Sequence, residues 1–227
     1  MTTVLLVRHG LTASTDVTLP GRALGLDLDD RGRAQAERLV ERLRDIALAA
    51  IVSSPMERCL QTVAPLATVV RQDVHVDERL VEAEYGEWTG RKLRELSREP
   101  LWKVVQQHPS AVTFPGGEAL RDVQARAVAA VRDWNTRLGP DAIWLACSHG
   151  DPIRAVVADA LGLHLDQFQR VGVSPGSVTV VRYGALRPVV AKLNDDGTSL
   201  SDLLKPGKGT GRPRGRLPSL RRTPPEA

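Results

Sequence analysis

Short apolar runs alternate with helical patterns along this chain of 227 residues, and the alternation restricts the fold to a small set. Four of the runs have the length and composition of buried strands, and they occupy residues 3–7, 49–54, 73–77 and 142–148. Strands that alternate with helices predict parallel pairing, because each helix carries the chain back across the sheet. We therefore expect an α/β fold, a three-layer α/β/α sandwich around a mostly parallel central sheet.

The segments between these runs have the spacing of helices that bury one face. Residues 30–45 place five apolar side chains on one helical stripe, at Ala34, Ala36, Leu39, Val40 and Leu43. Ser54 before Pro55 predicts an N-cap for a helix over 55–69. Further helices are expected over 118–138 and 151–162, with helical pieces around 91–107 in the irregular stretch 82–117, and segments 177–184 and 187–194 predict a terminal hairpin.

Residues 205–227 differ in composition from the rest of the chain. They are rich in proline and glycine and carry a net charge of +6 against +4 for the whole chain, which leaves −2 on residues 1–204. Such a segment cannot bury enough apolar surface to offset the entropy of ordering. We predict a folded domain over 1–204 and a disordered basic tail over 205–227. The tail sequence GRPRGR resembles an AT-hook core but lacks the proline after its last arginine, so we expect no nucleic-acid partner.

The two cysteines and the first residues indicate a compartment. Cys59 and Cys147 both lie in mostly apolar stretches and lack metal-ligand spacing, which predicts free thiols in a reducing environment. The start MTTVLL has no basic n-region, and no apolar run approaches the ~20 residues that cross a bilayer. We expect a cytoplasmic protein without a membrane partner. The sequence leaves the oligomeric state open, with a homodimer as one option.

Polar clusters stand at the carboxyl ends of three expected strands. Arg8, His9 and Gly10 end the first run, Arg58 follows the second by one helical turn, and His149 with Gly150 ends the fourth. Ligands of open parallel sheets bind at this edge, where helix N-termini add partial positive charge. Guanidinium groups match phosphate bidentately, and the two glycines would let backbone amides approach a ligand. A single cluster is typical of a surface turn, but three at one edge predict a phosphoryl site.

Five motifs occur along the chain in a fixed order, and they are LLVRHGLT, SSPMERCLQTVAPLA, LVEAEYGEWTG, FPGGEALRDVQAR and LACSHGDPIR. With them, residues 3–183 resemble the histidine phosphatase (phosphoglycerate mutase-like) superfamily. The resemblance implies that His9 is a nucleophile that forms a phosphohistidine. It also implies that Glu82 donates the proton to the leaving oxygen. Glu84 and Glu87 stand close by, and the family match alone favours Glu82 over them.

The resemblance further implies which residues hold the phosphoryl group, namely Arg8, Arg58 and His149, with contacts from Thr12 and the Gly150 amide. These cationic groups would make a divalent cation unnecessary, so we predict no metal and no cofactor. The loop 11–25 and the stretch 82–117 should line the pocket mouth. The substrate contacts that we expect from the loop are Ser14, Thr15, Gly21 and Arg22, with Arg22 for a second anionic group.

Three functions are open to such a chain. We expect a metal-independent phosphatase that acts on a small phosphorylated metabolite, because Leu11, Ser14 and Thr15 stand where the mutases have Glu, Trp and Asn. A phosphoglycerate mutase-type phosphomutase is the alternative. A non-catalytic phospho-ligand or protein-binding module is a third possibility, and the retained His9 and Glu82 argue against it.

Overall fold

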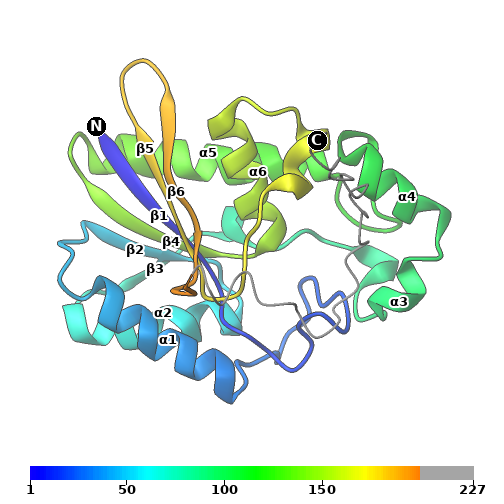
Figure 1. The fold of residues 1–227 in the computed structure, drawn as a ribbon, viewed down its shortest axis with the longest axis horizontal. Coiled ribbons are helices and arrows are strands. Elements are labelled where there is room, and N and C mark those ends of the chain that lie inside the picture. Colours follow the sequence, from blue (N-terminus) through cyan, green and yellow to red (C-terminus); the bar gives the residue numbers. More distant parts are fainter. Residues whose placement is uncertain (200–227) are drawn as a thin grey trace, which may run out of the picture. The chain divides into compact units, whose positions relative to one another are not determined.

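The computed structural model describes residues 1–199, of which Met1–Gly197 form one compact unit. Its strands form a single sheet in the order β3-β2-β4-β1-β5-β6 (Figure 1). Their bounds are β1 Thr2–Arg8, β2 Ala50–Ser53, β3 Val74–Val76, β4 Ile143–Ser148, β5 Val178–Tyr183 and β6 Pro188–Asp195. The four strands from β3 to β1 pair in parallel, and β5 and β6 are antiparallel. The expected mostly parallel α/β sheet is confirmed.

Helices cover both faces of this sheet. Their bounds are α1 Asp30–Leu43, α2 Glu57–Val70, α3 Leu93–Leu96, α4 Pro100–Gln107, α5 Leu120–Leu138 and α6 Gly150–Leu161. Short 3₁₀ turns are η1 Glu78–Leu80, η2 Gly86–Trp88, η3 Pro109–Ala111 and η4 Leu165–Arg170. Figure 1 shows α1 and α2 on one face and α5 and α6 on the other, with α3 and α4 beyond one end of the sheet.

Strand β1 shows why its sequence is apolar throughout. Val4 and Leu6 belong to the core cluster that includes α5 and α6 side chains, whereas Leu5 and Val7 belong to the cluster that includes α1 and α2 side chains. All four are buried. Because successive strand residues face opposite sides, a sheet covered on both faces needs apolar residues at every position. Each such side chain stabilises the fold by about 1.5–3 kcal/mol.

A third core cluster lies outside the sheet, where the irregular segment and η4 pack against residues of α5 and α6. Its large members are Tyr85, Trp88, Leu96, Phe114 and Phe168. The rings of Tyr85 and Phe114 meet edge to face at a centroid distance of 4.9 Å. This aromatic packing gives the stretch 82–117 a core of its own, so its position relative to the strand ends is fixed.

One helix start differs from the prediction. Helix α2 begins at Glu57, and its N-cap is Met56 instead of Ser54. The Ser54 hydroxyl lies 2.8 Å from His149 Nε2, so its main contact is a buried side chain rather than the helix terminus. The predicted helices otherwise agree within about two residues, and the terminal hairpin is confirmed. The proposed boundary at residue 204 and the basic tail lie outside the described residues. Within residues 1–199, no helix has the length and apolarity needed to traverse a bilayer.

Candidate active site

The parallel pairing of β1 with β4 brings the two motif histidines together. The register aligns Arg8 with Ser148, and the His9 amide donates to the Ser148 carbonyl at 3.0 Å. The rings of His9 and His149 consequently lie 5.1 Å apart, centroid to centroid. Helix α6 starts at Gly150, so the Gly150 amide has no acceptor inside the helix. The predicted meeting of these clusters at one sheet edge is thus present in the structure.

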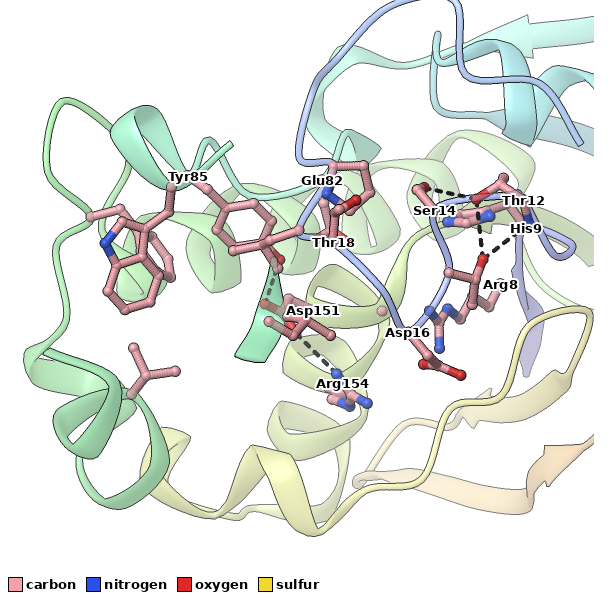
Figure 2. A pocket seen from close by; sticks show the side chains of 18 of the residues that line it. Arg8, His9, Thr12, Ser14, Asp16, Thr18, Glu82, Tyr85, Asp151 and Arg154 are labelled. Carbon is pink, nitrogen blue, oxygen red and sulfur yellow. Dashed lines mark hydrogen bonds and ion pairs between the residues drawn. The ribbon is translucent and has the colours of Figure 1, made fainter. Parts of the chain in front are cut away.

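A cavity of about 300 Å³ opens at this edge (Figure 2). One end of the cavity is lined by Arg8, His9, Thr12, Arg58, Glu82 and Gly150. Its middle is lined by Asp16, Tyr85, Asp151 and Arg154, and an apolar end is formed by Trp88, Trp102, Phe114 and neighbouring aliphatic residues. Figure 2 shows Tyr85 and His9 on opposite sides of the view, with Glu82 between them.

His9 is held as a neutral imidazole with one nitrogen available. Its Nδ1 lies 2.8 Å from the Gly10 carbonyl oxygen, which only accepts, so Nδ1 carries the proton. The lone pair is therefore on Nε2. Burial holds the pKa of His9 well below its usual range, and the nearby Arg58 and Arg8 lower it further. A neutral imidazole with a free Nε2 is the form that can attack phosphorus.

Two arginines present buried, unpartnered nitrogens at the same end of the cavity. Arg8 donates from Nη1 to the Val173 carbonyl at 2.7 Å, and Arg58 donates from Nη2 to the Gly21 carbonyl at 2.7 Å. Among residues 1–199, Arg8 Nε and the Nε and Nη1 of Arg58 have no hydrogen-bond partner. Buried donors without acceptors are costly, so their clustering indicates a site for an oxyanion.

His149, which the resemblance places at the phosphoryl group, contacts Arg58 and Ser54 in the structure. It is fully buried and does not line the cavity. Arg58 Nη2 donates to its Nδ1 at 3.1 Å, so the proton is on Nε2, which donates to Ser54 Oγ. Burial, and then Arg58, hold the pKa of His149 well below its usual range. His149 is therefore neutral here and orients Arg58, instead of adding a positive charge of its own.

Glu82 has the properties of a general acid. Its side chain is buried at the cavity, with Oε1 accepting from the Ala83 amide at 3.0 Å. Burial, reinforced by the Asp151 carboxylate, raises the pKa of Glu82 to about 7. A carboxyl group with such a pKa carries its proton over the lower half of the physiological range and can release it. Neither Glu84 nor Glu87 lines the cavity.

Comparison with known proteins identifies the family. Residues 4–196 match the histidine phosphatase superfamily (branch 1). The chain belongs to this superfamily. It is 31% identical over 205 residues to phosphoserine phosphatase 1 of Hydrogenobacter thermophilus, covering 86% of this chain and 92% of that protein. It is 30% identical to glucosyl-3-phosphoglycerate phosphatase of Mycolicibacterium vanbaalenii, covering 74% and 78%. The structure of Bacillus stearothermophilus YhfR is similar with a TM-score of 0.80 at 29% identity, covering 86% of this chain and 98% of that one.

The loop residues expected at this histidine phosphatase site divide into two groups. Thr12, Ser14 and Thr15 line the cavity, and the Thr12 hydroxyl lies 3.0 Å from Ser14 Oγ and 3.1 Å from Thr15 Oγ1. Gly21 and Arg22 do not line it. Arg22 instead donates to the Glu82 carbonyl at 2.9 Å and to Glu118 at 2.8 Å, so it holds the backbone of Glu82.

Gly10 also has another role than the expected one. Its amide donates to Thr62 Oγ1 at 3.0 Å and is therefore not available to a ligand. An added Cβ at Gly10 would lie 2.8 Å from the Gly32 carbonyl oxygen, so the residue permits close approach of α1 to the end of β1. The Gly10 position therefore serves the packing of α1 beside His9.

We did not predict from the sequence that Asp151 and Arg154 line the cavity. Asp151 accepts from the Tyr85 hydroxyl at 2.8 Å and from Arg154 Nη1 at 3.0 Å. Asp151 and Arg154 are three residues apart at the start of α6, directly after the SHG triplet, so they share one helix face. This spacing in the sequence could have indicated that the Asp151 and Arg154 side chains interact. Within residues 1–199, no cluster of three or more His, Cys, Asp or Glu is arranged to hold a metal ion.

Proposed function

We propose that this chain is a phosphatase that hydrolyses a small phosphomonoester through a phosphohistidine at His9. The observation that carries the proposal is the neutral His9 ring beside buried guanidinium nitrogens of Arg8 and Arg58 that lack partners. A phosphoryl group supplies the acceptors that these donors lack. The same contacts stabilise the charge on the equatorial oxygens as the transition state forms.

In the first step, His9 Nε2 forms a bond to phosphorus and the ester oxygen leaves. The leaving oxygen takes the proton of Glu82, whose raised pKa keeps that proton in place before the reaction. The Gly10 carbonyl retains the Nδ1 proton of His9 and so stabilises the positive charge that develops on the ring. The products of this step are an alcohol, a phosphohistidine and an ionised Glu82.

In the second step, water attacks the phosphohistidine. Glu82, now a carboxylate, takes a proton from the water, and the bond from phosphorus to Nε2 breaks. Inorganic phosphate leaves, and both side chains return to their starting protonation states. Arg58 stays oriented throughout by His149 and the Gly21 carbonyl.

Two observations favour hydrolysis over a mutase reaction. The relatives at 30–31% identity named above are phosphatases. The residues after His9 depart from the mutase pattern at Leu11, Ser14 and Thr15, and the last two line the open cavity with small hydroxyl side chains. A phosphohistidine reached by water is hydrolysed, whereas a mutase must exclude water from it.

Hydrolysis of p-nitrophenyl phosphate in the presence of EDTA tests the proposal. We expect phosphate release from the wild-type chain and its loss in His9→Ala. His75→Ala, which changes an exposed histidine on β3, is the matched control and should retain full activity. Activity that survives His9→Ala would contradict the mechanism. Conversion of 3- to 2-phosphoglycerate after bisphosphoglycerate priming, with little phosphate released, would instead establish a mutase.

A further inference from the structure

Arg154 supplies the middle of the cavity with a cationic side chain that the proposed mechanism does not use. The residue lies in the second turn of α6 and lines the cavity. Its Nη1 donates to Asp151 Oδ1 at 3.0 Å, and its Nε donates to the Val171 carbonyl at 3.2 Å. Among residues 1–199, Nη2 has no hydrogen-bond partner, and 29% of the side chain is exposed. One edge of this guanidinium is therefore open to a ligand.

The orientation of Arg154 is fixed by Asp151, whose carboxylate is itself held by Tyr85. Asp151 holds its Nη1, and the Tyr85 hydroxyl in turn holds the other oxygen of Asp151 at 2.8 Å. Figure 2 shows this chain of contacts running from Tyr85 through Asp151 to Arg154. A guanidinium held in place before the ligand arrives loses little rotamer entropy on binding, which favours recognition of an anion.

Arg154 also lies close to the phosphoryl end of the cavity. An added Cβ at Gly150 would lie 3.4 Å from Arg154 Nη1 and 3.8 Å from Arg8 Cζ, so both guanidinium groups flank the same glycine. The pKa of Arg8 is lowered by burial and then by the charge of Arg154. Two like charges this close favour a ligand with two anionic groups a few bonds apart, one for each arginine.

Two carboxylates restrict the kind of anion that suits Arg154. Asp151 and Asp16 line the same part of the cavity. Their charge repels a second phosphate dianion more strongly than a carboxylate monoanion. Arg22, which the sequence suggested for a second anionic group, is engaged with Glu82 and Glu118 and does not line the cavity.

We propose that Arg154 is a specificity-determining residue that binds a substrate carboxylate, so that the preferred substrates are phosphomonoesters of small carboxylic acids. This proposal rests on the phosphatase function proposed above. The phosphoryl group occupies the Arg8 and Arg58 end, and the carboxylate of the same molecule pairs with the open edge of Arg154. The ester oxygen then faces Glu82, which lines the cavity together with these arginines.

A matched pair of substrates tests the role of Arg154. 3-Phosphoglycerate and glycerol 3-phosphate differ only in a carboxylate against a hydroxymethyl group, so the ratio of their kcat/KM values reports the carboxylate contact alone. We expect the wild-type chain to prefer 3-phosphoglycerate, and Arg154→Met to reduce the ratio by about tenfold or more. Arg132→Met removes another arginine paired with an α6 carboxylate, Asp159, but outside the cavity, and should leave the ratio unchanged.

A second variant and a second pair keep the test decisive. Arg154→Lys retains the charge but loses the fork geometry and should give an intermediate ratio, which a purely structural role would not. Phosphoserine against phosphoethanolamine repeats the comparison on an amine background. A ratio that is the same in the wild type and in Arg154→Met, or no wild-type preference for the acid, would overturn the assignment. Failure of the wild type to hydrolyse p-nitrophenyl phosphate would instead overturn the proposed function.

Discussion

At the scale of single residues, the site shifts the pKa values of His9 and Glu82 in opposite directions, and both shifts favour the neutral form. Burial and two arginines keep His9 neutral, whereas burial and Asp151 keep Glu82 protonated up to a pKa of about 7. A neutral base beside a neutral acid is the combination that attack and leaving-group protonation require. The same cavity therefore prepares both partners of the first step.

The raised pKa of Glu82 predicts a pH dependence of catalysis. The protonated form is needed in the first step, so kcat/KM for an ester with a poor leaving group should fall as the pH rises through about 7. Glu82→Gln should lower kcat/KM for that ester by at least about a hundredfold. The loss should be smaller for p-nitrophenyl phosphate, whose leaving group needs no proton. Equal losses for both esters would contradict the acid role.

The raised pKa of Glu82 also predicts how the free energy of unfolding depends on pH. A folded-state pKa above the unfolded value contributes stability below the unfolded pKa, and this contribution is lost as the pH rises through about 7. Glu82→Gln should therefore raise the free energy of unfolding at pH 8 by about 1–3 kcal/mol and change it little at pH 4. Urea denaturation at the two pH values measures the difference. A variant that is less stable than the wild type at pH 8 would contradict a raised pKa of Glu82 in the folded state.

At the scale of secondary-structure elements, the junction of β1 with α1 depends on glycines. An added Cβ at Gly32 would lie 2.0 Å from the Leu11 carbonyl oxygen, and no positive φ is involved. Gly-to-Ala changes inside helices usually stabilise by about 0.5–1 kcal/mol. Gly32→Ala should instead destabilise by about 1–3 kcal/mol, because the loop after His9 must move. Thermal denaturation checks this, with Glu37→Ala on the exposed face of α1 as the control, and a rise in Tm for Gly32→Ala would refute it.

The elements that the sequence predicted well are those with a single dominant signal. Strands β1 and β4 could be predicted from the sequence because both of their faces are buried, so their apolar runs are continuous. The start of α2 could not, because Ser54 and Pro55 have the composition of a helix cap while Ser54 is needed by His149. A long-range side-chain contact overrode the local capping preference, and no local pattern reports such a contact.

At the scale of the whole molecule, the site joins segments that are far apart in the chain. Tyr85 comes from the irregular segment and Asp151 from α6, and their contact depends on how the aromatic cluster places residues 82–117. The sequence indicated the strand-end residues, since sheet topology alone brings them together. It could not indicate the contact between Tyr85 and Asp151 or the neutral, buried state of His149, which follow from packing between elements.

The basic tail gives a prediction at this scale. Residues 205–227 lie outside the described structure and carry a net charge of +6. Truncation after residue 204 should leave kcat/KM for p-nitrophenyl phosphate within about twofold of the full chain, because the described residues already supply every side chain that the mechanism uses. The assay should be run at low and at high ionic strength. A large loss of activity on truncation at either ionic strength would show that the tail contributes to turnover.

Trapping the phosphohistidine tests whether His9 carries the phosphoryl group during turnover. The chain is mixed with excess substrate, quenched in alkali, where a phosphohistidine survives, and the proteolytic peptide that contains His9 is analysed by mass spectrometry. We predict one phosphoryl group on His9 that is lost on acid treatment and absent in His9→Ala. A phosphoryl group on another residue, or hydrolysis by His9→Ala at the wild-type rate, would rule out the proposed mechanism.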